Sequence, residues 1–134
     1  MLPDAEFHHI GVACESFARE QDKFAALGYR QESSDVYDPV QRVHVRFLIG
    51  GGPRMELVCG DGQAGPLTAW LKSGVKMYHL AYVVKDMAAS MAFLKSQGAR
   101  VVVDAVPAVA FGGQKISFLI LPNLLLVELI EQSL

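Results

Sequence analysis

The chain repeats itself, and this repeat constrains its fold more than any other feature. His9 precedes Gly28 by the same number of residues as His79 precedes Gly98. An arginine follows each of these glycines at the same short spacing. Several matches in one register are typical of two copies of one structural unit.

The matches continue along both halves. Each histidine is followed, at the same spacing, by a residue type that caps helices, Ser16 and Asp86. Later in each half an apolar strand leads to a glutamate between apolar residues, Glu56 and Glu128. We therefore expect one domain over 1–134, with a first module over about 6–60, a linker over about 61–76 and a second module over about 77–132.

Each module is predicted to run strand, helix, then three strands. β-branched and apolar runs predict strands, helical spacing of apolar residues predicts the helices, and a short helix is expected in the linker. The predicted strands cover 7–13, 29–37, 43–49, 54–59, 77–84, 100–103, 115–121 and 124–131, and the predicted helices cover 16–28, 66–72 and 87–97. The fold class is α+β, with two paired βαβββ modules in a curled, mostly antiparallel eight-stranded sheet.

Alternation along the strands places four polar side chains on one face. The apolar neighbours of His9 suit the helix-covered face of the sheet, so the histidine points to the opposite face. The same reasoning puts Glu56, His79 and Glu128 on that face. His8 has the opposite parity, and we expect it at the surface or in the core.

A divalent metal ion is the expected partner of these four residues. A single strand histidine is usually a satisfied core residue, and a single strand glutamate usually points to solvent. Two matched carboxylates inside a sheet wall are costly without a partner, however, and two imidazoles with two carboxylates neutralise a divalent ion. We predict His9, Glu56, His79 and Glu128 as ligands of one ion, which Zn, Ni, Co, Mn, Mg or Fe would all satisfy.

These residues resemble the vicinal oxygen chelate superfamily, which holds glyoxalases, methylmalonyl-CoA epimerases, extradiol dioxygenases and bleomycin-type resistance proteins. The resemblance implies βαβββ modules around a metal-binding cup, often in a dimer, with the ligands on His9, Glu56, His79 and Glu128. The motifs that carry it are His8-His9-Ile-Gly-Val, Leu27-Gly28-Tyr29, Met55-Glu56-Leu57-Val58, Tyr78-His79-Leu80-Ala81-Tyr82 and Leu126-Val127-Glu128-Leu129-Ile130-Glu131.

The resemblance implies a metal-dependent lyase or isomerase, similar to lactoylglutathione lyase or to methylmalonyl-CoA epimerase. A metal ion holding a carbonyl oxygen stabilises the enolate that forms when a proton leaves the adjacent carbon. Glu128 and Glu56 are the candidate catalytic bases, and resemblance to the epimerases favours Glu128. A ring-cleaving dioxygenase is an alternative, but such enzymes use two histidines and one carboxylate, and Glu56 supplies a further ligand.

The substrate is expected to be a small α-oxygenated acid, a thioester or a glutathione adduct. Arg46 and His44 alternate with apolar residues, and we predict them on the same face as the metal ligands, with Lys115 at the matching position of the second module. Phe111 lies in a glycine-containing loop, 109–113, that is a candidate cover for the pocket.

Two features depart from the best-known members of the superfamily. Where the epimerases carry a second glutamate base, this chain has Val40 and Gln41, with Asp38 as the one nearby carboxylate. The long segments with which larger glyoxalases grip glutathione are also missing. A non-catalytic protein that sequesters a small molecule, as in bleomycin resistance, therefore stays an alternative.

The charge balance and the cysteines restrict the remaining classes. Lys and Arg total 12 against 14 Asp and Glu, so the chain lacks the excess of basic residues typical of nucleic-acid-binding proteins. No segment reads as a signal peptide or membrane span. Cys14 and Cys59 lack the spacing of a zinc knuckle or a disulfide framework. We expect a cytoplasmic protein, and a homodimer because small curled sheets leave edges to cover.

Overall fold

The computed structural model describes residues 1–62 and 65–133. They group into two compact units. The first unit is His9–Tyr78, and the second unit consists of Met1–His8 together with the chain from His79 onward. The unit boundaries therefore fall inside two strands, β1 (Ala5–Ala13) and β6 (Met77–Val84).

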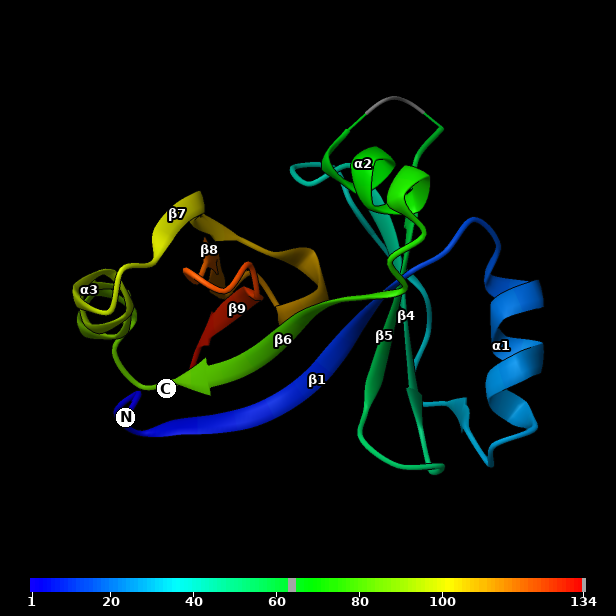
Figure 1. Cartoon of the computed structure of the whole chain (residues 1–134). Helices are drawn as coiled ribbons and strands as arrows, with labels where there is room; N and C mark the ends of the chain where they lie inside the picture. The colour runs from blue at the N-terminus through cyan, green and yellow to red at the C-terminus, as the bar shows by residue number, and fades with distance from the viewer. Residues whose placement is uncertain (63–64, 134) are drawn as a thin grey trace. The chain divides into compact units, whose positions relative to one another are not determined.

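The first unit is built on strand β4, which pairs antiparallel with three other strands. Its neighbours are β2, β3 and β5, and β5 pairs in parallel with the end of β1. Helix α1 lies along β4 and β5 (Figure 1). The elements after β1 are α1 (Phe17–Ala25), β2 (Arg30–Gln31), β3 (Val36–Asp38), β4 (Val43–Ile49), β5 (Met55–Gly60) and α2 (Pro66–Ser73).

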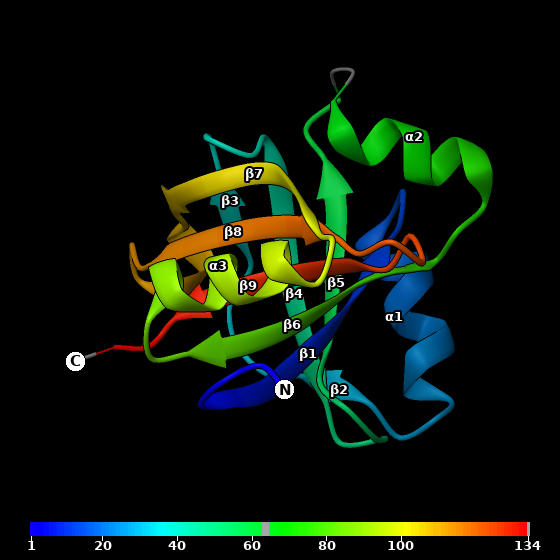
Figure 2. The same cartoon turned by 60° about the vertical axis from the view of Figure 1, so that its left-hand side comes forward.

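The second unit also runs from a strand through a helix to further strands, with β7 in place of the two short strands β2 and β3. Its strands lie in the order β6-β9-β8-β7, with β6 and β9 parallel and the other pairs antiparallel. Helix α3 covers β8 and β9 (Figure 2). The elements after β6 are α3 (Met87–Ser96), β7 (Arg100–Pro107), the short 3-10 helix η1 (Val109–Phe111), β8 (Lys115–Ile120) and β9 (Leu126–Glu131).

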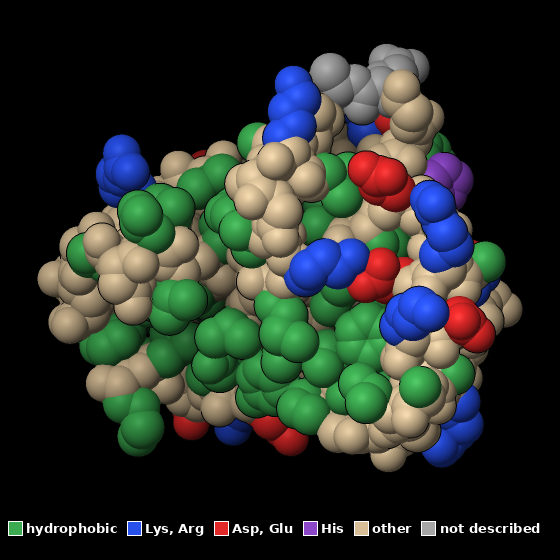
Figure 3. All heavy atoms as spheres, turned by 45° about the vertical axis from the view of Figure 1, so that its right-hand side comes forward, with side chains coloured by type: hydrophobic (Ala, Val, Ile, Leu, Met, Phe, Trp, Pro, Cys, Tyr) green, Lys and Arg blue, Asp and Glu red, His purple; other side chains and the backbone are tan. Residues whose placement is uncertain are grey.

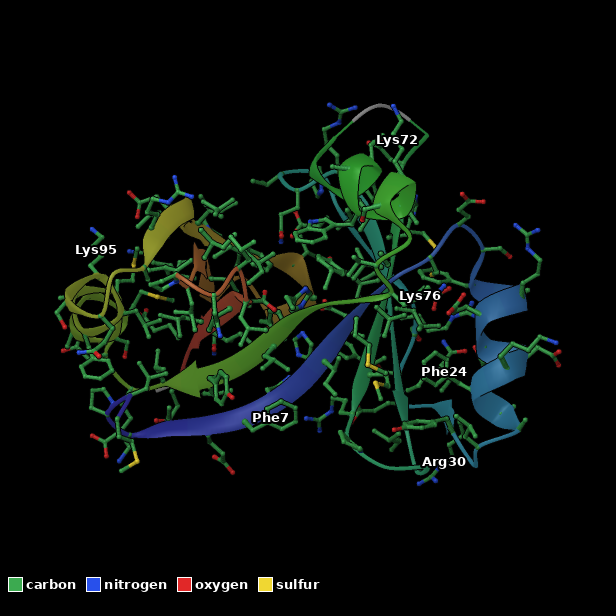
Figure 4. All side chains as sticks on the ribbon, in the orientation of Figure 1. Phe7, Phe24, Arg30, Lys72, Lys76 and Lys95 are labelled. Atoms are coloured by element: carbon green, nitrogen blue, oxygen red, sulfur yellow. The ribbon has the colours of Figure 1, made fainter. Side chains whose placement is uncertain are left out.

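Helix α1 begins at the predicted cap. The Ser16 hydroxyl accepts a hydrogen bond from the Arg19 backbone N–H at 3.4 Å, which satisfies a donor that the first turn leaves open. Phe17 and Phe24 then pack on the buried residues of the sheet, and Figure 4 shows Phe24 pointing from α1 toward the strands. The helix is amphipathic, so this packing holds it on one face of β4 and β5.

Helix α3 repeats this arrangement in the second unit. The Asp86 carboxylate accepts a hydrogen bond from the Ala89 backbone N–H at 2.9 Å. Met91 and Leu94 are buried against Leu119 of β8 and its neighbours on β9. Each unit thus has one helix that covers one face of its strands.

The predicted α+β class with mostly antiparallel strands is confirmed, with one difference in the strand count. The strand expected over 29–37 is interrupted, so the described residues form nine strands rather than eight. Polar side chains bond to one another in this interval: Gln31 Nε2 donates to the Ser33 carbonyl at 2.7 Å and to Asp35 Oδ1 at 3.1 Å. Such local hydrogen bonds compete with strand pairing. The short linker helix is present as α2.

The surface of the first unit carries charges of both signs. Figure 3 shows Lys and Arg side chains beside Asp and Glu side chains. Lys76 Nζ lies 2.8 Å from Glu20, and Arg54 Nε lies 3.0 Å from Glu32. Among the residues that the structure describes, no helix has the length and apolar character needed to cross a membrane.

Candidate functional site

The first unit holds a buried histidine–glutamate pair. His9 on β1 is fully buried and Glu56 on β5 is 5% exposed, and His9 Nε2 lies 3.4 Å from Glu56 Oε1. Pairing of Gly11 with Glu56 brings the two strands into this register. Ile10 and Val12 pack toward α1, so His9 occupies the face away from that helix, as its parity predicted.

The ring of Phe47 forms one wall of this pair. Phe47 on β4 stands directly across from Glu56, and its ring meets the His9 imidazole edge to face, with centroids 5.4 Å apart. Phe47 itself is buried. The imidazole and the carboxylate therefore lie beside apolar surface, which weakens their contact with water.

The second unit reproduces the pair with the corresponding residues. His79 on β6 and Glu128 on β9 are 3% and 2% exposed, and His79 Nε2 lies 3.3 Å from Glu128 Oε1. Glu128 pairs with Ala81 of β6 on one side and with Phe118 of β8 on the other. The Phe118 ring meets His79 edge to face at 5.2 Å. The sequence repeat therefore corresponds to a repeated local arrangement of one histidine, one glutamate and one phenylalanine.

The chemistry of both pairs fits a divalent metal ion. Imidazole nitrogens and carboxylate oxygens are ordinary metal ligands, and a buried carboxylate needs a compensating positive charge. Separations of 3.3 and 3.4 Å are longer than a usual N–H···O hydrogen bond. Two ligand atoms that each lie about 2.1 Å from one ion, at tetrahedral or octahedral angles, are about 3.0–3.4 Å apart. The ligand roles themselves stay a prediction.

Two aromatic residues of the site, Phe47 and Phe118, were not predicted from the sequence. Both occupy matched positions in the repeat, on the strand beside a glutamate. The signal that identifies them is this match, since hydrophobic character alone does not separate them from the rest of the core.

Arg46 lies on a different face from the one predicted. It pairs across the strands with Leu57, whose side chain is part of the core under α1. Its guanidinium lies over the Phe17 ring at 4.7 Å and forms a salt bridge with Asp35 at 2.7 Å. The hydrogen bonds from Arg46 hold the pKa of the Asp35 carboxyl below its usual value of 3.8. The expected position beside Glu56 is wrong, because Phe47 occupies that face.

The same inversion applies to the other predicted substrate residues on strands. His44 stands across from Cys59, two residues beyond Leu57, and its ring contacts Tyr37 at 4.7 Å. In the second unit, the Ser117 hydroxyl lies 3.2 Å from Met87 Sδ of α3. Lys115 is at the exposed start of β8, two residues before Ser117. Its side chain therefore lies on the same, helix-covered side of the strand.

Phe111 lies in η1 and contacts His8. The two rings meet edge to face at 5.6 Å within the second unit. His8 is half-buried, and its parity on β1 is opposite to that of His9, as expected. A role of Phe111 in substrate binding stays a prediction.

Asp38, the carboxylate nearest to the position of the epimerases' second base, holds a turn. It is 1% exposed. Its Oδ1 accepts from the backbone N–H groups of Val40 and Gln41 at 2.9 and 3.1 Å, and its Oδ2 accepts from Gln41 Nε2 at 2.9 Å. Both oxygens are engaged, so this carboxylate stabilises the turn between β3 and β4.

The comparisons with known proteins identify the family and the fold. A sequence model described as the Glyoxalase/Bleomycin resistance protein/Dioxygenase superfamily matches residues 8–118. No curated protein matches the chain.

Solved structures resemble this one over nearly its whole length. A hypothetical protein from Bacillus halodurans has a TM-score of 0.81 at 24% identity, covering 97% of this chain and 96% of its own. The Mycobacterium tuberculosis methylmalonyl-CoA epimerase has a TM-score of 0.78 at 22% identity, covering 96% and 88%. The Streptomyces coelicolor methylmalonyl-CoA epimerase in complex with 2-nitronate-propionyl-CoA has a TM-score of 0.78 at 24% identity, covering 96% and 97%. The chain therefore belongs to the glyoxalase/bleomycin resistance protein/dioxygenase superfamily, also called the vicinal oxygen chelate superfamily.

Proposed function

We propose that this protein is a divalent-metal-dependent isomerase or lyase that moves a proton next to a carbonyl group. In this proposal His9, Glu56, His79 and Glu128 supply the four ligands of one ion. The observation that carries it is the repeated buried histidine–glutamate pair, with 3.4 Å between the ligand atoms in one unit and 3.3 Å in the other. The two carboxylates would balance the charge of a divalent ion.

When bound, the ion supplies the positive charge that makes a C–H bond beside a carbonyl more acidic. The protein's own part is to hold and move the proton. An oxygen of the Glu128 carboxylate would accept the proton, and return to the same carbon gives an epimerase while return to its neighbour gives an isomerase. Glu56 is the alternative base. Phe47 and Phe118 would keep water away from the two carboxylates.

The substrate we favour is a coenzyme A thioester with an acidic hydrogen at the carbon next to the thioester carbonyl. The basis is similarity of fold to methylmalonyl-CoA epimerases, one of them solved with 2-nitronate-propionyl-CoA. A small α-oxygenated acid and a glutathione adduct are the other substrate classes compatible with this chemistry. We further propose a homodimer, and light scattering that shows a monomer would overturn that part.

Metal analysis is the first experiment. The purified whole chain, loaded with divalent metal and freed of excess, should hold about one ion, and Glu56→Ala should hold much less because a ligand is missing. A protein that takes up no divalent ion would contradict the proposal and favour a non-catalytic module that binds small molecules.

Proton exchange is the second experiment. In deuterated water the metal-loaded protein should exchange the hydrogen next to the carbonyl of a 2-methyl-branched acyl-CoA. Glu128→Gln should slow this exchange by about 10²–10⁴-fold, the usual contribution of a general base. Glu131→Gln is the matched control, because it changes a glutamate on the same strand outside the pair. Full activity of Glu128→Gln would exclude this base and leave Glu56 to be tested.

A further inference from the structure

The first unit brings its two cysteines into contact. Cys14 and Cys59 lie 45 positions apart in the chain, yet their Sγ atoms are 3.1 Å apart and both residues are buried. The parallel pairing of β1 with β5 causes this contact: Ala13 pairs with Val58, and the Cys14 N–H donates to the Val58 carbonyl. The residue after Ala13, directly beyond β1, is Cys14, and the residue after Val58, within β5, is Cys59.

This thiol pair is separate from the proposed metal ligands. Cys59 is part of the buried cluster under α1 together with Leu57, whereas Glu56 points to the other face of β5. Cys14 is likewise on the α1 side of β1, and His9 is on the opposite side. The chemistry of the two thiols is therefore independent of the proposed function.

A cavity of the first unit reaches one member of the pair, Cys14. This cavity of about 290 Å³ is lined by Cys14 and by polar residues of α1 and the segment before β6. Its charged lining includes Arg19, Glu20 and Lys76, and the last two form an ion pair at 2.8 Å. Figure 4 labels Lys76, the last residue of the segment before β6. The cavity admits molecules several times larger than water.

The two sulfurs are not equivalent. Their hydrogen bond lowers the pKa of the Cys59 thiol, and the nearby Arg46 guanidinium acts in the same direction against burial and Glu20. The same hydrogen bond and burial raise the pKa of the Cys14 thiol. These directions favour Cys59 as the attacking thiolate and Cys14 as its protonated partner, an assignment that the single substitutions below test.

We propose that Cys14 and Cys59 form a dithiol site at which a hydroperoxide makes an intrachain disulfide. The Cys59 thiolate attacks one peroxide oxygen and breaks the O–O bond, which gives a sulfenic acid at Cys59 and releases hydroxide when the oxidant is hydrogen peroxide. The Cys14 sulfur then attacks the Cys59 sulfur, its proton leaves with the hydroxyl group as water, and the S–S bond forms. The two thiols lose two electrons, and the peroxide gains them.

The backbone geometry accommodates this bond. Adjacent strands lie about 4.8 Å apart, inside the range of about 4.4–6.8 Å between the Cα atoms of disulfide-bonded cysteines. The sulfurs have to approach from 3.1 Å to about 2.05 Å. Rotation of the two side chains covers a shift of about 1 Å, so β1 and β5 keep their pairing.

The test is oxidation of the reduced, folded chain by hydrogen peroxide. The chain has only two cysteines, so an intrachain disulfide has one possible connectivity. Intact mass should fall by two hydrogen atoms, thiol titration of the unfolded product should find none left, and a peptide map should link the two cysteine-containing segments. Because the fold holds the thiols together, the disulfide should form at least about tenfold faster than in urea-unfolded chain.

Single substitutions supply the controls. The Cys14→Ser variant keeps the nucleophile and loses its partner, so dimedone should trap a sulfenic acid at Cys59. The Cys59→Ser variant should give less of this adduct. The proposal is overturned if both thiols of the folded wild-type chain survive peroxide, if they gain oxygen without joining, if they join only between chains, or if the unfolded chain forms the disulfide equally fast.

Discussion

Arg46 and Asp35 form a two-pronged salt bridge, in which Nε and Nη2 of the guanidinium each donate to a different carboxylate oxygen at 2.7 Å. The arginine also lies over the Phe17 ring and donates to Gln21 Oε1 at 2.7 Å. One side chain thus links β4 to the segment after β2 and to α1. The charge that the sequence suggested for substrate binding is neutralised within its own unit.

Replacement of Arg46 by alanine should lower the free energy of unfolding by about 1 kcal/mol, because a partly exposed bidentate pair and a stacking contact are both lost. Urea unfolding followed by circular dichroism measures this. The matched control is Lys23→Ala. Lys23 is 85% exposed and its Nζ lies 3.9 Å from Asp22 Oδ2, so this surface pair should contribute little to stability. Equal effects of the two substitutions would contradict the role assigned to Arg46.

The Asp35 pair should also make stability depend on pH in one direction. The folded chain holds the pKa of this carboxyl below its usual 3.8, so its stabilisation is present above that pH and is lost as the pH falls through the lower, folded pKa. The difference in unfolding free energy between wild type and Asp35→Asn should therefore shrink as the pH falls from 6 through 3.8 and below. A difference that stays constant over this range would be inconsistent with the depressed pKa.

Asp38→Ala should destabilise the chain by about 1–3 kcal/mol. The substitution removes the acceptor of two backbone N–H groups and of the Gln41 amide at a position that is 1% exposed. Urea unfolding again gives the value. Unchanged stability combined with lost proton-exchange activity would restore the interpretation of Asp38 as a base.

Gly51→Ala should lower the free energy of unfolding by about 1–3 kcal/mol, because an added Cβ would clash with the Leu27 carbonyl oxygen and with the Tyr29 ring. The turn cannot simply move away, since the Tyr29 hydroxyl donates to the Pro53 carbonyl at 2.7 Å. Gly60→Ala is the control, as a Cβ there meets nothing within 4 Å. Thermal unfolding should separate the two variants, and similar melting temperatures would show that the turn has room.

His9→Ala should abolish or strongly weaken metal binding, whereas His8→Ala should retain it. The two histidines are neighbours in sequence, but only His9 is paired with Glu56 at 3.4 Å, on the face away from α1. Metal content after dialysis against a weak chelator is the measurement, with circular dichroism to establish that both variants fold. Retained metal in His9→Ala would remove His9 from the ligand set.

The sequence predicts which face of the strands carries the four candidate ligands, His9, Glu56, His79 and Glu128. Their neighbours along each strand are apolar and pack under a helix. The order of elements and both helix caps followed from similar local signals. The face of Arg46 was not predictable in this way. On β4 the polar residues alternate with Val45 and Phe47, and either set can face a helix when the polar side chains find partners such as Asp35.

The contact between the two cysteines was not predictable from the sequence. Cys14 and Cys59 meet only because β1 and β5 pair in parallel in one register, and no local signal specifies that register. The interruption of the strand over 29–37 was not predicted either, and it coincides with side-chain hydrogen bonds of Gln31 to Ser33 and Asp35.

The division of β1 between the two units has a consequence for the order of events during synthesis. Leu2 and Ala5 pack on the core that α3, β8 and β9 complete, and Phe7 meets Tyr82 edge to face at 5.7 Å. The part of β1 before His9 therefore finds these partners only after the later strands β8 and β9 have been synthesised. The segment His9–Tyr78 has its own partners earlier in synthesis, so we expect it to fold ahead of the residues that precede it in β1.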